Sequence, residues 1–396
     1  MNIYLVGGAV RDRLLDIPVK DRDWLVVGGS EAEMVERGFV RADGQFPVFL
    51  HPETGEEYAL ARREAKTGPG YKGFSVEYGP DVTLEEDLQR RDFTINALVE
   101  NEAGEVIDRV GGLDDLAQRR LRHITPAFSE DPVRLLRAAR FIARLSKHGF
   151  SLAHDTFSLM KQMATGEELA ALKPERVWQE LKRALPEPEP WRFFETLQRC
   201  GALASLLPPL AEAMTEATAE SEASDAAHGE QPDCEPIRAL KRAVAAGADP
   251  QVCFAALFHS LCQGLARASW LKAALPVERE YLDLLAQLQG VARFYPGTVR
   301  QEAAATLDLL IRGRAQQQPE RFHRLLLLCG VVWPAPPEQL AAWLAEAGRA
   351  MASISPARLS EEGLQGADLG RVLRERQIRA IAAVADEVKY INHTCG

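Results

Sequence analysis

Residues 19–29 read "VKDRDWLVVGG", a stretch that places two aspartates one residue apart at the start of an apolar run. The run from Trp24 to Val27, closed by two glycines, is typical of a buried strand. Side chains alternate along a strand, so Asp21 and Asp23 are expected on one face, about 6–7 Å apart. Neighbouring carboxylates repel each other unless a cation neutralises them, and oxygen ligands of this kind suit Mg²⁺. The alternative is that both aspartates lie at a solvent-facing strand edge and bind nothing.

The composition indicates a chain of at least two packed domains. It has 396 residues, 46% of them hydrophobic, and it contains no apolar run long enough to cross a membrane. The N-terminus shows no secretory signal, and six scattered cysteines without metal-ligand spacing indicate reduced, structural thiols. We therefore expect a cytoplasmic protein with no membrane partner.

The net charge of −10 is unevenly distributed, which bears on nucleic-acid binding. Residues 212–235 hold eight acidic and no basic residues, whereas residues 119–147 hold eight basic and two acidic residues. Because local charge decides phosphate binding, an RNA partner is compatible with the acidic total.

The chain changes pattern near residue 115, from mixed strands and helices to helices alone. Before that point the stretches "NIYLVGG", "DRDWLVVGG", "FPVFLHP" and "EEYALARRE" predict strands. After it, apolar positions recur every three or four residues nearly to the end, interrupted by proline-rich stretches at 185–191 and 333–339.

Two further segments are predicted to be flexible. The stretch "TGPGYKG" at 67–73 predicts a mobile loop. Residues 211–236 are predicted to form an acidic flexible linker, because 215–233 is polar and low in large apolar side chains.

Two short motifs flank the aspartate pair and are suited to phosphate binding. Gly7 and Gly8 follow a strand and precede an amphipathic helix, where backbone N–H groups can approach a phosphate and Arg11 can reach the same group. Downstream, "QRRDFTINAL" places Arg90, Arg91 and Asp92 before a helix-compatible run. Alone, the first motif is also typical of a simple turn and the second of a surface ion pair. In this order, they supply a phosphate cradle and charge compensation around a metal pair, as phosphoryl-type transfer requires.

A fourth motif, "EDPVRLLRAAR", is suited to reading a nucleobase. Asp131 and Arg134 lie three residues apart, and are expected on one helix face. A carboxylate accepts hydrogen bonds and a guanidinium only donates them, so this pair matches the amino group and ring nitrogen of cytosine and adenine. Arg137 and Arg140 continue the stripe and are candidates for phosphate contacts. The alternative is a solvated basic face over a core of apolar residues, namely Leu135, Leu136, Phe141 and Leu145.

The motifs "GGAVRD", "DRDWLVV", "RRDFTINAL" and "EDPVRLLRAARFIARL" together resemble the bacterial class II tRNA nucleotidyltransferase (CCA-adding) and poly(A) polymerase family, from Met1 to about residue 200. The resemblance implies an α+β fold with a polymerase-β-like nucleotidyltransferase head on a mixed sheet, followed by an all-α neck, body and tail. We place the head at 1–120, the neck and body at 121–210, the linker at 211–236 and the remaining body and tail at 237–396.

The resemblance also implies a reaction and its participants. Mg²⁺ would be held by Asp21 and Asp23, and the protein would be a monomer that adds CCA to tRNA from CTP and ATP. The residues implied in nucleotide binding are Gly8, Arg11, Arg91, Asp131, Arg134, Arg137 and Arg140, with Gly7, Arg90 and Asp92 as secondary candidates. The loop at 67–73 is associated in this family with the switch from C to A addition. No third acidic ligand is evident, and Glu57 is only a candidate.

The C-terminal half departs from many relatives. "VCFAALFHSLCQG" resembles the start of a metal-dependent phosphohydrolase domain, but His259 is followed by Ser260 instead of Asp. We therefore expect that activity to be absent and His259 to be a packed histidine. Four arginines near the C-terminus are compatible with an RNA contact or a solvated face: Arg371, Arg374, Arg376 and Arg379.

Three alternative functions stay open. An A-adding enzyme and a poly(A) polymerase share the head motifs, although the acidic total disfavours generic RNA binding by the latter. A non-catalytic tRNA-binding protein would have no use for the repelling pair Asp21 and Asp23.

Overall fold

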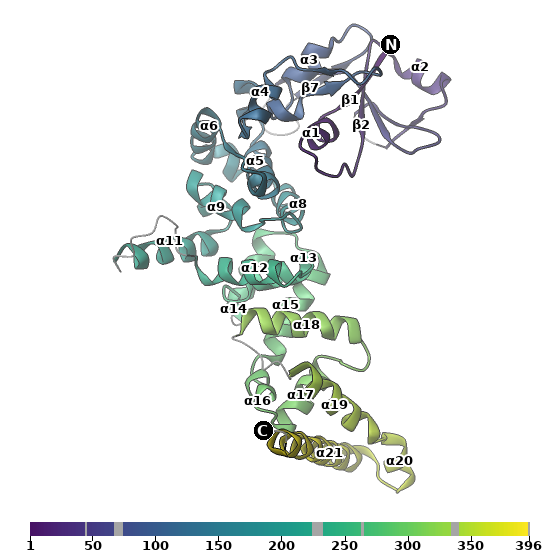
Figure 1. Cartoon of the computed structure of the whole chain (residues 1–396), viewed down its shortest axis with the longest axis vertical. Helices are drawn as coiled ribbons and strands as arrows, with labels where there is room; N and C mark the ends of the chain where they lie inside the picture. The colour runs from purple at the N-terminus through teal and green to yellow at the C-terminus, as the bar shows by residue number, and fades with distance from the viewer. Residues whose placement is uncertain (44–45, 67–73, 224–232, 263–264, 334–339, 395–396) are drawn as a thin grey trace. The chain divides into compact units, whose positions relative to one another are not determined.

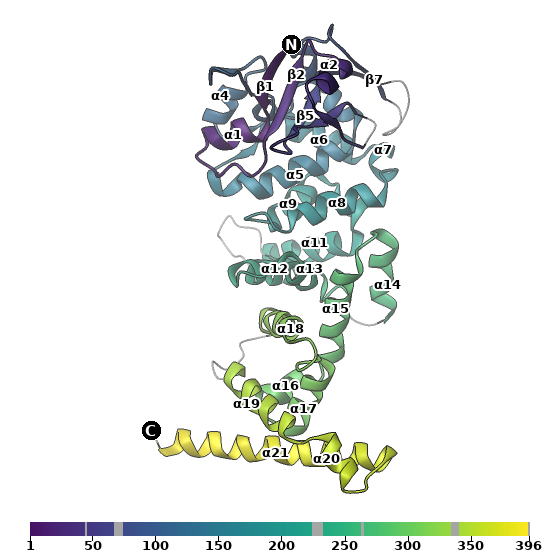
Figure 2. The ribbon, with the colours of Figure 1, turned by 90° about the vertical axis from the view of Figure 1, so that its right-hand side faces the viewer.

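The computed structural model describes residues 1–43, 46–66, 74–223, 233–262, 265–333 and 340–394 (Figures 1 and 2). The chain divides into two compact units, Met1–Glu212 and Ala213–Gly396, and each is described by itself. Across the described ranges, no helix is both long enough and apolar enough to cross a membrane.

The first unit is built on a mixed sheet of seven strands in the order β3-β4-β5-β2-β1-β8-β9. The central strand β2 pairs antiparallel with β1 and parallel with β5. Leu25 packs into one core cluster and Val26 into another, so both faces of the sheet are covered. This burial explains the uninterrupted apolar run after the aspartates. The sheet strands are β1 (Asn2–Val6), β2 (Asp23–Val27), β3 (Val40–Arg41), β4 (Val48–Leu50), β5 (Glu57–Leu60), β8 (Val99–Glu100) and β9 (Val106–Ile107).

Short helices and a separate hairpin complete the part around the sheet. The hairpin strands β6 (Arg62–Lys66) and β7 (Phe74–Tyr78) pair antiparallel. The expected mobile loop at 67–73 lies between them and outside the described residues. The helices are α1 (Gly8–Leu14), α2 (Glu31–Glu36), α3 (Leu84–Gln89), η1 (Thr94–Asn96) and α4 (Gly112–Ala117).

The rest of the first unit is helical apart from the two-stranded pair β10 (Arg120–Leu121) and β11 (Ser151–Leu152). Helix α5 (Val133–Leu145) lies between the sheet and helices α8 and α9 (Figures 1 and 2). The four apolar residues predicted for its core face are all buried. The other elements are η2 (Pro126–Glu130), η3 (Ser146–His148), α6 (His154–Ala164), α7 (Glu167–Ala170), α8 (Pro174–Ala184), α9 (Trp191–Cys200), α10 (Leu203–Leu206) and the start of α11 (Pro208–Ala223), which continues past the boundary at Glu212.

The second unit is helical throughout its described residues. The five described cysteines of the whole chain are buried and form no disulfide, as expected for structural thiols. Helices end before the proline-rich stretches at 185–191 and 333–339, as predicted.

The helices that lie wholly in the second unit are α12 (Glu235–Ala245), α13 (Pro250–Phe258), α14 (Leu265–Ala274), α15 (Arg279–Val291), α16 (Tyr295–Val299), α17 (Ala303–Arg312), α18 (Pro319–Val332), α19 (Leu340–Ser353), α20 (Pro356–Glu361) and α21 (Gly366–Thr394).

The α+β fold is confirmed, but three local expectations are corrected. The strand begins at Asp23, so Asp21 precedes it and the strand spacing does not apply to the pair. The run after Asp92 forms only the short 3₁₀ helix η1 before continuing into β8. The segment expected to be a linker is helical as far as Ala223, because its alanines and glutamates are strong helix formers; residues 224–232 lie outside the described part.

Close packing of α4 against η1 predicts that Gly112 tolerates no side chain. A Cβ atom there would lie 2.4 Å from the Thr94 carbonyl oxygen. We expect Gly112→Ala to lower the free energy of unfolding by about 1–3 kcal/mol, measured by urea unfolding. In the control Gly290→Ala, on α15, a Cβ atom would meet nothing within 4 Å and stability should hold or rise. Equal stability of Gly112→Ala and wild type would contradict the packing argument.

Candidate functional site

A cavity of about 920 Å³ in the first unit brings the separate sequence motifs together. Every residue predicted for metal or nucleotide binding lines it, although these residues come from four distant segments. They are Gly7, Gly8, Arg11, Asp21, Asp23, Arg90, Arg91, Asp92, Asp131, Arg134, Arg137 and Arg140. The candidate ligand Glu57 is not among the lining residues.

Several lining residues were missed by sequence reasoning. Arg144 extends the Arg137 and Arg140 stripe by one helical step, so periodicity alone could have indicated it. Arg62 and Arg176 come from elements that carry no motif and gave no local signal. The full set of missed polar and aromatic lining residues is Asp12, Lys20, Phe46, Arg62, Glu64, Asn96, Phe141, Arg144 and Arg176.

The turn between β1 and α1 requires glycine at position 7. Its φ of 75° lies in the left-handed region, and its N–H donates to the Leu98 carbonyl at 3.0 Å. A Cβ atom there would lie 3.3 Å from the Asn96 carbonyl oxygen and 3.7 Å from Arg91 Nη1. The turn therefore lets the backbone of β1 approach the segment that carries the arginine pair.

The two aspartates form an uncompensated patch of negative charge on the cavity wall. Asp23 starts β2 and lies opposite Glu57 of β5 in the sheet register. Burial raises the pKa of Asp23, and the charges of Glu57 and Asp21 raise it further, against a lowering by Arg91. In the described part of the chain, the side-chain carboxylates of Asp21 and Asp23 have no hydrogen-bond or ion-pair partner. Open carboxylate oxygens that repel each other fit a hard divalent cation.

The carboxylates proposed here as metal ligands are limited to Asp21 and Asp23. Among the described residues, no group of three His, Cys, Asp or Glu side chains is arranged to hold a metal ion. A Mg²⁺ ion can nevertheless be bound by two carboxylates when substrate phosphates and water supply its other ligands.

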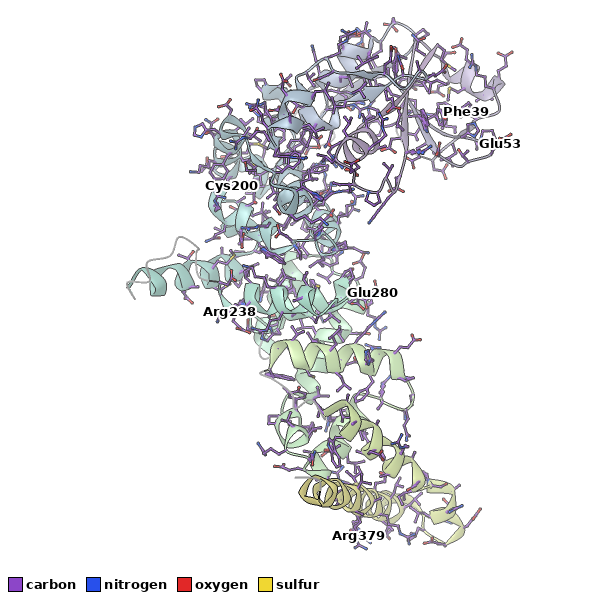
Figure 3. The ribbon with its side chains drawn as sticks, in the orientation of Figure 1. Phe39, Glu53, Cys200, Arg238, Glu280 and Arg379 are labelled. Carbon is purple, nitrogen blue, oxygen red and sulfur yellow. The ribbon has the colours of Figure 1, made fainter. Side chains whose placement is uncertain are left out.

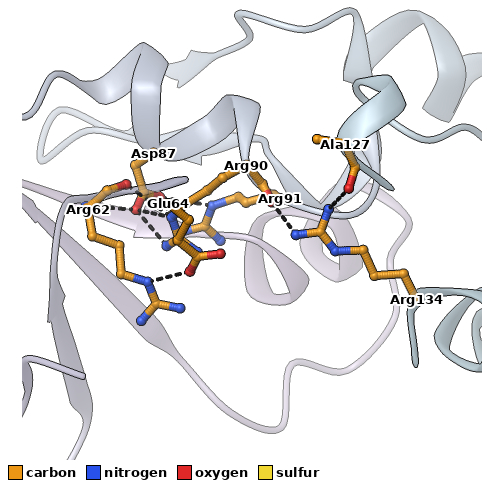
Figure 4. A network of polar contacts seen from close by, with 7 residues as sticks. All are labelled: Arg62, Glu64, Asp87, Arg90, Arg91, Ala127 and Arg134. Carbon is orange, nitrogen blue, oxygen red and sulfur yellow. Dashed lines mark hydrogen bonds and ion pairs between the residues drawn. The ribbon is translucent and has the colours of Figure 1, made fainter. Parts of the chain in front are cut away.

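The arginine pair is fixed by a buried carboxylate behind it (Figure 4). Asp87, on α3, accepts from Arg90 Nη2 at 2.6 Å and from Arg91 Nη2 at 3.0 Å. Burial would raise the pKa of Asp87, but Arg91 and Arg90 outweigh it and hold that pKa below its ordinary value. Glu64 accepts a second bond from Arg90, through Nη1 at 3.2 Å. Both arginines are therefore held in place before any ligand arrives.

Ion pairs also connect α5 to the sheet region. Arg137 Nε donates to Asp92 Oδ2 at 2.7 Å, and Arg144 Nη2 donates to Asp12 Oδ2 at 2.6 Å. Asp12 accepts in addition from Arg11 Nε at 2.8 Å, and the side chain of Arg11 is only 2% exposed. Arg11 is thus a buried, paired residue that lines the cavity.

Arg140 is also paired in this ligand-free state. Its Nε donates to Glu180 Oε2 of α8 at 2.7 Å. The side chain of Arg140 is 11% exposed, so the stripe is not a solvated basic face. The stripe faces the cavity, as the nucleotide-binding hypothesis requires.

The geometry of the base-reading pair differs from the prediction. Asp131 has extended backbone and precedes α5, so it does not share a helix face with Arg134. The carboxylate of Asp131 accepts two bonds from Arg176 of α8, at 2.9 and 2.8 Å. Arg134 donates to the carbonyls of Arg90 and Ala127, at 2.8 and 3.2 Å (Figure 4). Each member is therefore positioned by other elements while both line the cavity.

The cavity as a whole is suited to a polyanion. Its lining holds ten arginine or lysine side chains against six carboxylates. Arginine forks match phosphate oxygens, and the surplus of positive charge raises the local concentration of phosphate-bearing ligands.

The candidate residues of the second unit are engaged within the chain. His259 directly follows α13, its Nδ1 lies 2.7 Å from the Ala256 carbonyl oxygen, and burial lowers the pKa of its ring. On α21, Arg374 and Arg376 make two hydrogen bonds each to Asp308 and Glu362.

The other two α21 arginines differ from each other. Arg371 pairs with Asp368 and Glu375, whereas Arg379 is exposed on the same helix (Figure 3). Three of the four arginines are thus already paired with carboxylates of the chain.

The comparisons with known proteins agree with this architecture. Residues 3–122 match a family described as "Poly A polymerase head domain", and residues 149–214 match "Probable RNA and SrmB- binding site of polymerase A". The first unit therefore carries a nucleotidyltransferase head.

Full-length relatives define the family. A CCA-adding enzyme of Marinobacter nauticus is 42% identical over 96% of this chain and 98% of its own length. A Multifunctional CCA protein of Thioalkalivibrio sulfidiphilus is 41% identical over 98% of this chain and 99% of its own. The chain belongs to the family of CCA-adding enzymes, which are tRNA nucleotidyltransferases. The Bacillus stearothermophilus CCA-adding enzyme, solved in complex with CTP, has the same fold, with a TM-score of 0.68, 24% identity and coverage of 99% of this chain and 93% of that one.

The buried pair of Asp92 and Arg137 predicts a pH-dependent loss of stability. Burial opposes ionisation of Asp92, but Arg137 outweighs it and lowers the pKa below the ordinary value of 3.8. The pair therefore stabilises the fold above that pH, and the contribution is lost as pH falls through the lower folded-state pKa. We expect Asp92→Asn to cost about 3 kcal/mol at pH 7 in urea unfolding, with a difference from wild type that shrinks below pH about 4. The exposed control Asp114→Asn should change little, and a pH-independent difference for Asp92→Asn would contradict the ion-pair account.

Proposed function

We propose that this protein adds CCA to the 3′ end of tRNA from CTP and ATP and releases pyrophosphate. The observation that carries the proposal is the single cavity that collects all four motifs in a chain similar over its full length to CCA-adding enzymes. In each cycle the RNA 3′ oxygen would bond to the α-phosphorus of the nucleotide. The bond to the pyrophosphate oxygen would break, and the hydroxyl proton would pass to solvent.

The proposed metal ligands are Asp21 and Asp23. Bound Mg²⁺ would supply a Lewis acid that favours deprotonation of the 3′ hydroxyl and neutralises charge on the phosphates. The chain itself would hold the triphosphate against Arg91, which Asp87 fixes, and against the backbone of the Gly7–Gly8 turn. In such transfers the protein contributes mostly positioning and charge neutralisation.

The proposed base-reading pair is Asp131 with Arg134. The carboxylate would accept from the amino group of cytosine or adenine, and the guanidinium would donate to the neighbouring ring nitrogen. Uracil and guanine present the reverse pattern, so donors would face donors and acceptors would face acceptors. Arg176 supports this role because its two hydrogen bonds fix the orientation of the Asp131 carboxylate.

The proposal is tested with purified protein, Mg²⁺ and three tRNA transcripts that end before CCA, after C and after CC. Each transcript is incubated with labelled CTP, ATP or both. Growth of the first transcript by C, C and A would establish CCA addition. Extension of only the CC-ending transcript would indicate an A-adding enzyme, and long A tracts on unrelated RNA a poly(A) polymerase. Retained tRNA binding without incorporation would leave a non-catalytic binder.

We also propose that the phosphohydrolase activity expected of relatives with a complete metal site is absent from this chain. Ser260 stands where a second metal ligand would follow His259, and the ring of His259 is tied to the Ala256 carbonyl. Hydrolysis of a chromogenic phosphate ester in the presence of divalent transition metals would contradict this proposal.

The metal role predicts that Asp21→Ala abolishes incorporation while tRNA binding persists. Losing one of two ligands should cost several kcal/mol of transition-state stabilisation, or about a thousandfold in rate. Chelation of the divalent metal should give the same loss in the wild type. The matched control is Asp114→Ala, an exposed aspartate outside the cavity. Parallel loss of tRNA affinity in Asp21→Ala would count against the metal role.

The base-reading role predicts that Asp131→Ala relaxes the choice of nucleotide. Misincorporation of UTP and GTP relative to CTP should rise about tenfold or more, because a bidentate base contact is worth about 1–3 kcal/mol. Arg176→Ala should shift selectivity in the same direction by a smaller factor, whereas Arg183→Ala, an exposed arginine of the same helix, should not. Unchanged misincorporation in Asp131→Ala would refute this role.

A further inference from the structure

Arg62 lines the cavity but has no part in the proposed handling of the incoming nucleotide. Arg62 begins β6, where side chains alternate between two faces. Arg62 and Glu64 line the cavity, whereas Arg63 between them is not a lining residue and pairs with Asp81 at 2.7 Å. Because side chains alternate along β6, Arg62 lies in the site and the neighbouring Arg63 lies outside it.

The guanidinium of Arg62 is held on its face and on one edge. Its central carbon lies 3.9 Å from the centre of the Phe46 ring, and its Nε donates to Glu64 Oε1 at 2.9 Å. Its two terminal amino groups have no hydrogen-bond partner within the described ranges, and Figure 4 shows them directed away from the Asp87 network. The side chain is nevertheless only 16% exposed. A flat, backed guanidinium with two open donors is suited to bind one phosphate.

The balance of charges around Arg62 also favours binding of an anion. Arg62, Arg90 and Arg91 are compensated by only two carboxylates, Glu64 and Asp87. Within these ion pairs the positive charges exceed the negative charges by one, beside a cavity that already carries a cationic surplus. A phosphate at Arg62 would neutralise this excess.

The position of Arg62 favours RNA over the nucleotide triphosphate as the source of that phosphate. Figure 4 shows Arg62 and Arg134 on opposite sides of the Arg90–Arg91 pair. The base of the incoming nucleotide is assigned to the side of Arg134, and Arg91 to its phosphates. The second substrate, the RNA end, must bring its 3′ hydroxyl to the α-phosphate from elsewhere in the same cavity.

We propose that Arg62, backed by Phe46 and fixed by Glu64, binds a backbone phosphodiester of the 3′-terminal nucleotides of the RNA that is extended. This inference rests on the proposed nucleotidyl transfer and adds a site for its second substrate. Glu64 also contacts Arg90, so the same carboxylate connects the RNA site to the nucleotide site.

The test distinguishes the RNA backbone from the nucleoside triphosphate as the source of the phosphate. It does so by comparing the Michaelis constants for the two substrates. KM for a tRNA transcript lacking CCA and KM for CTP are measured for wild type, Arg62→Gln, Arg62→Lys, Phe46→Ala and the control Arg63→Gln. We expect Arg62→Gln to raise KM for tRNA about tenfold, as loss of a charge-assisted contact predicts, with KM for CTP within about twofold of wild type. Arg62→Lys should recover part of the loss, Phe46→Ala should raise KM for tRNA about threefold, and Arg63→Gln should match wild type.

Direct RNA binding gives a second readout. In filter binding, the slope of the logarithm of affinity against the logarithm of salt concentration should fall by about one in Arg62→Gln. A rise in KM for CTP with unchanged KM for tRNA would assign Arg62 to the triphosphate and overturn the proposal, as would an equal effect of Arg63→Gln. Failure of the wild-type protein to incorporate nucleotides would overturn the proposed function instead. Unchanged RNA affinity in Arg62→Gln would then still overturn the role of Arg62.

Discussion

The site depends on the ion pairs that attach helix α5 to the sheet region. Asp92 with Arg137 and Asp12 with Arg144 join residues that are 45 and 132 positions apart in the chain. Their carboxylates are almost fully buried, so each pair is strong only while both partners are present. Without this attachment, Asp21 and Asp23 would not share one cavity with Asp131 and Arg134. The position of the candidate site is therefore determined by charge pairing as well as by apolar packing.

A consequence of this arrangement is that the lining arginines are ordered in advance. A phosphate-binding site made of unsupported arginines would lose side-chain entropy when it closes on a ligand. Here Asp87 fixes the Arg90–Arg91 pair and Glu180 fixes Arg140, behind or beside the cavity surface. The supporting carboxylates reduce the net positive charge, but the lining keeps a surplus of cations. Preorganised charge of this kind favours the transition state of phosphoryl-type transfer, where reorientation of the surroundings is costly.

Sequence reasoning was sufficient where a residue's role follows from its immediate neighbours. Gly7 at a strand–helix turn, Asp23 at a strand start and the apolar face of α5 are local patterns, and the structure confirms them. The extended backbone of Asp131 was also predictable in principle, because the residue before proline is disfavoured in the helical region. Arg176 and Arg62 were not predictable, since their roles arise from contacts with elements distant in the chain. The 3₁₀ turn after Asp92 likewise reflects tertiary packing, with Phe93 bridged to His123.

The proposed selection of bases without a nucleic-acid template would place a specific demand on Asp131. An ionised carboxylate offers about four acceptor positions. Arg176 occupies two of them, and the N–H of Val133 donates at 3.1 Å to one of the same oxygens. The acceptor capacity left for a nucleobase is thus small and has a fixed direction. An ionised carboxylate can accept from an amino group but cannot donate to a carbonyl. A freely rotating carboxylate could direct its oxygens several ways, so in the proposed role the discrimination against uracil and guanine would depend on Arg176 as well as on Asp131.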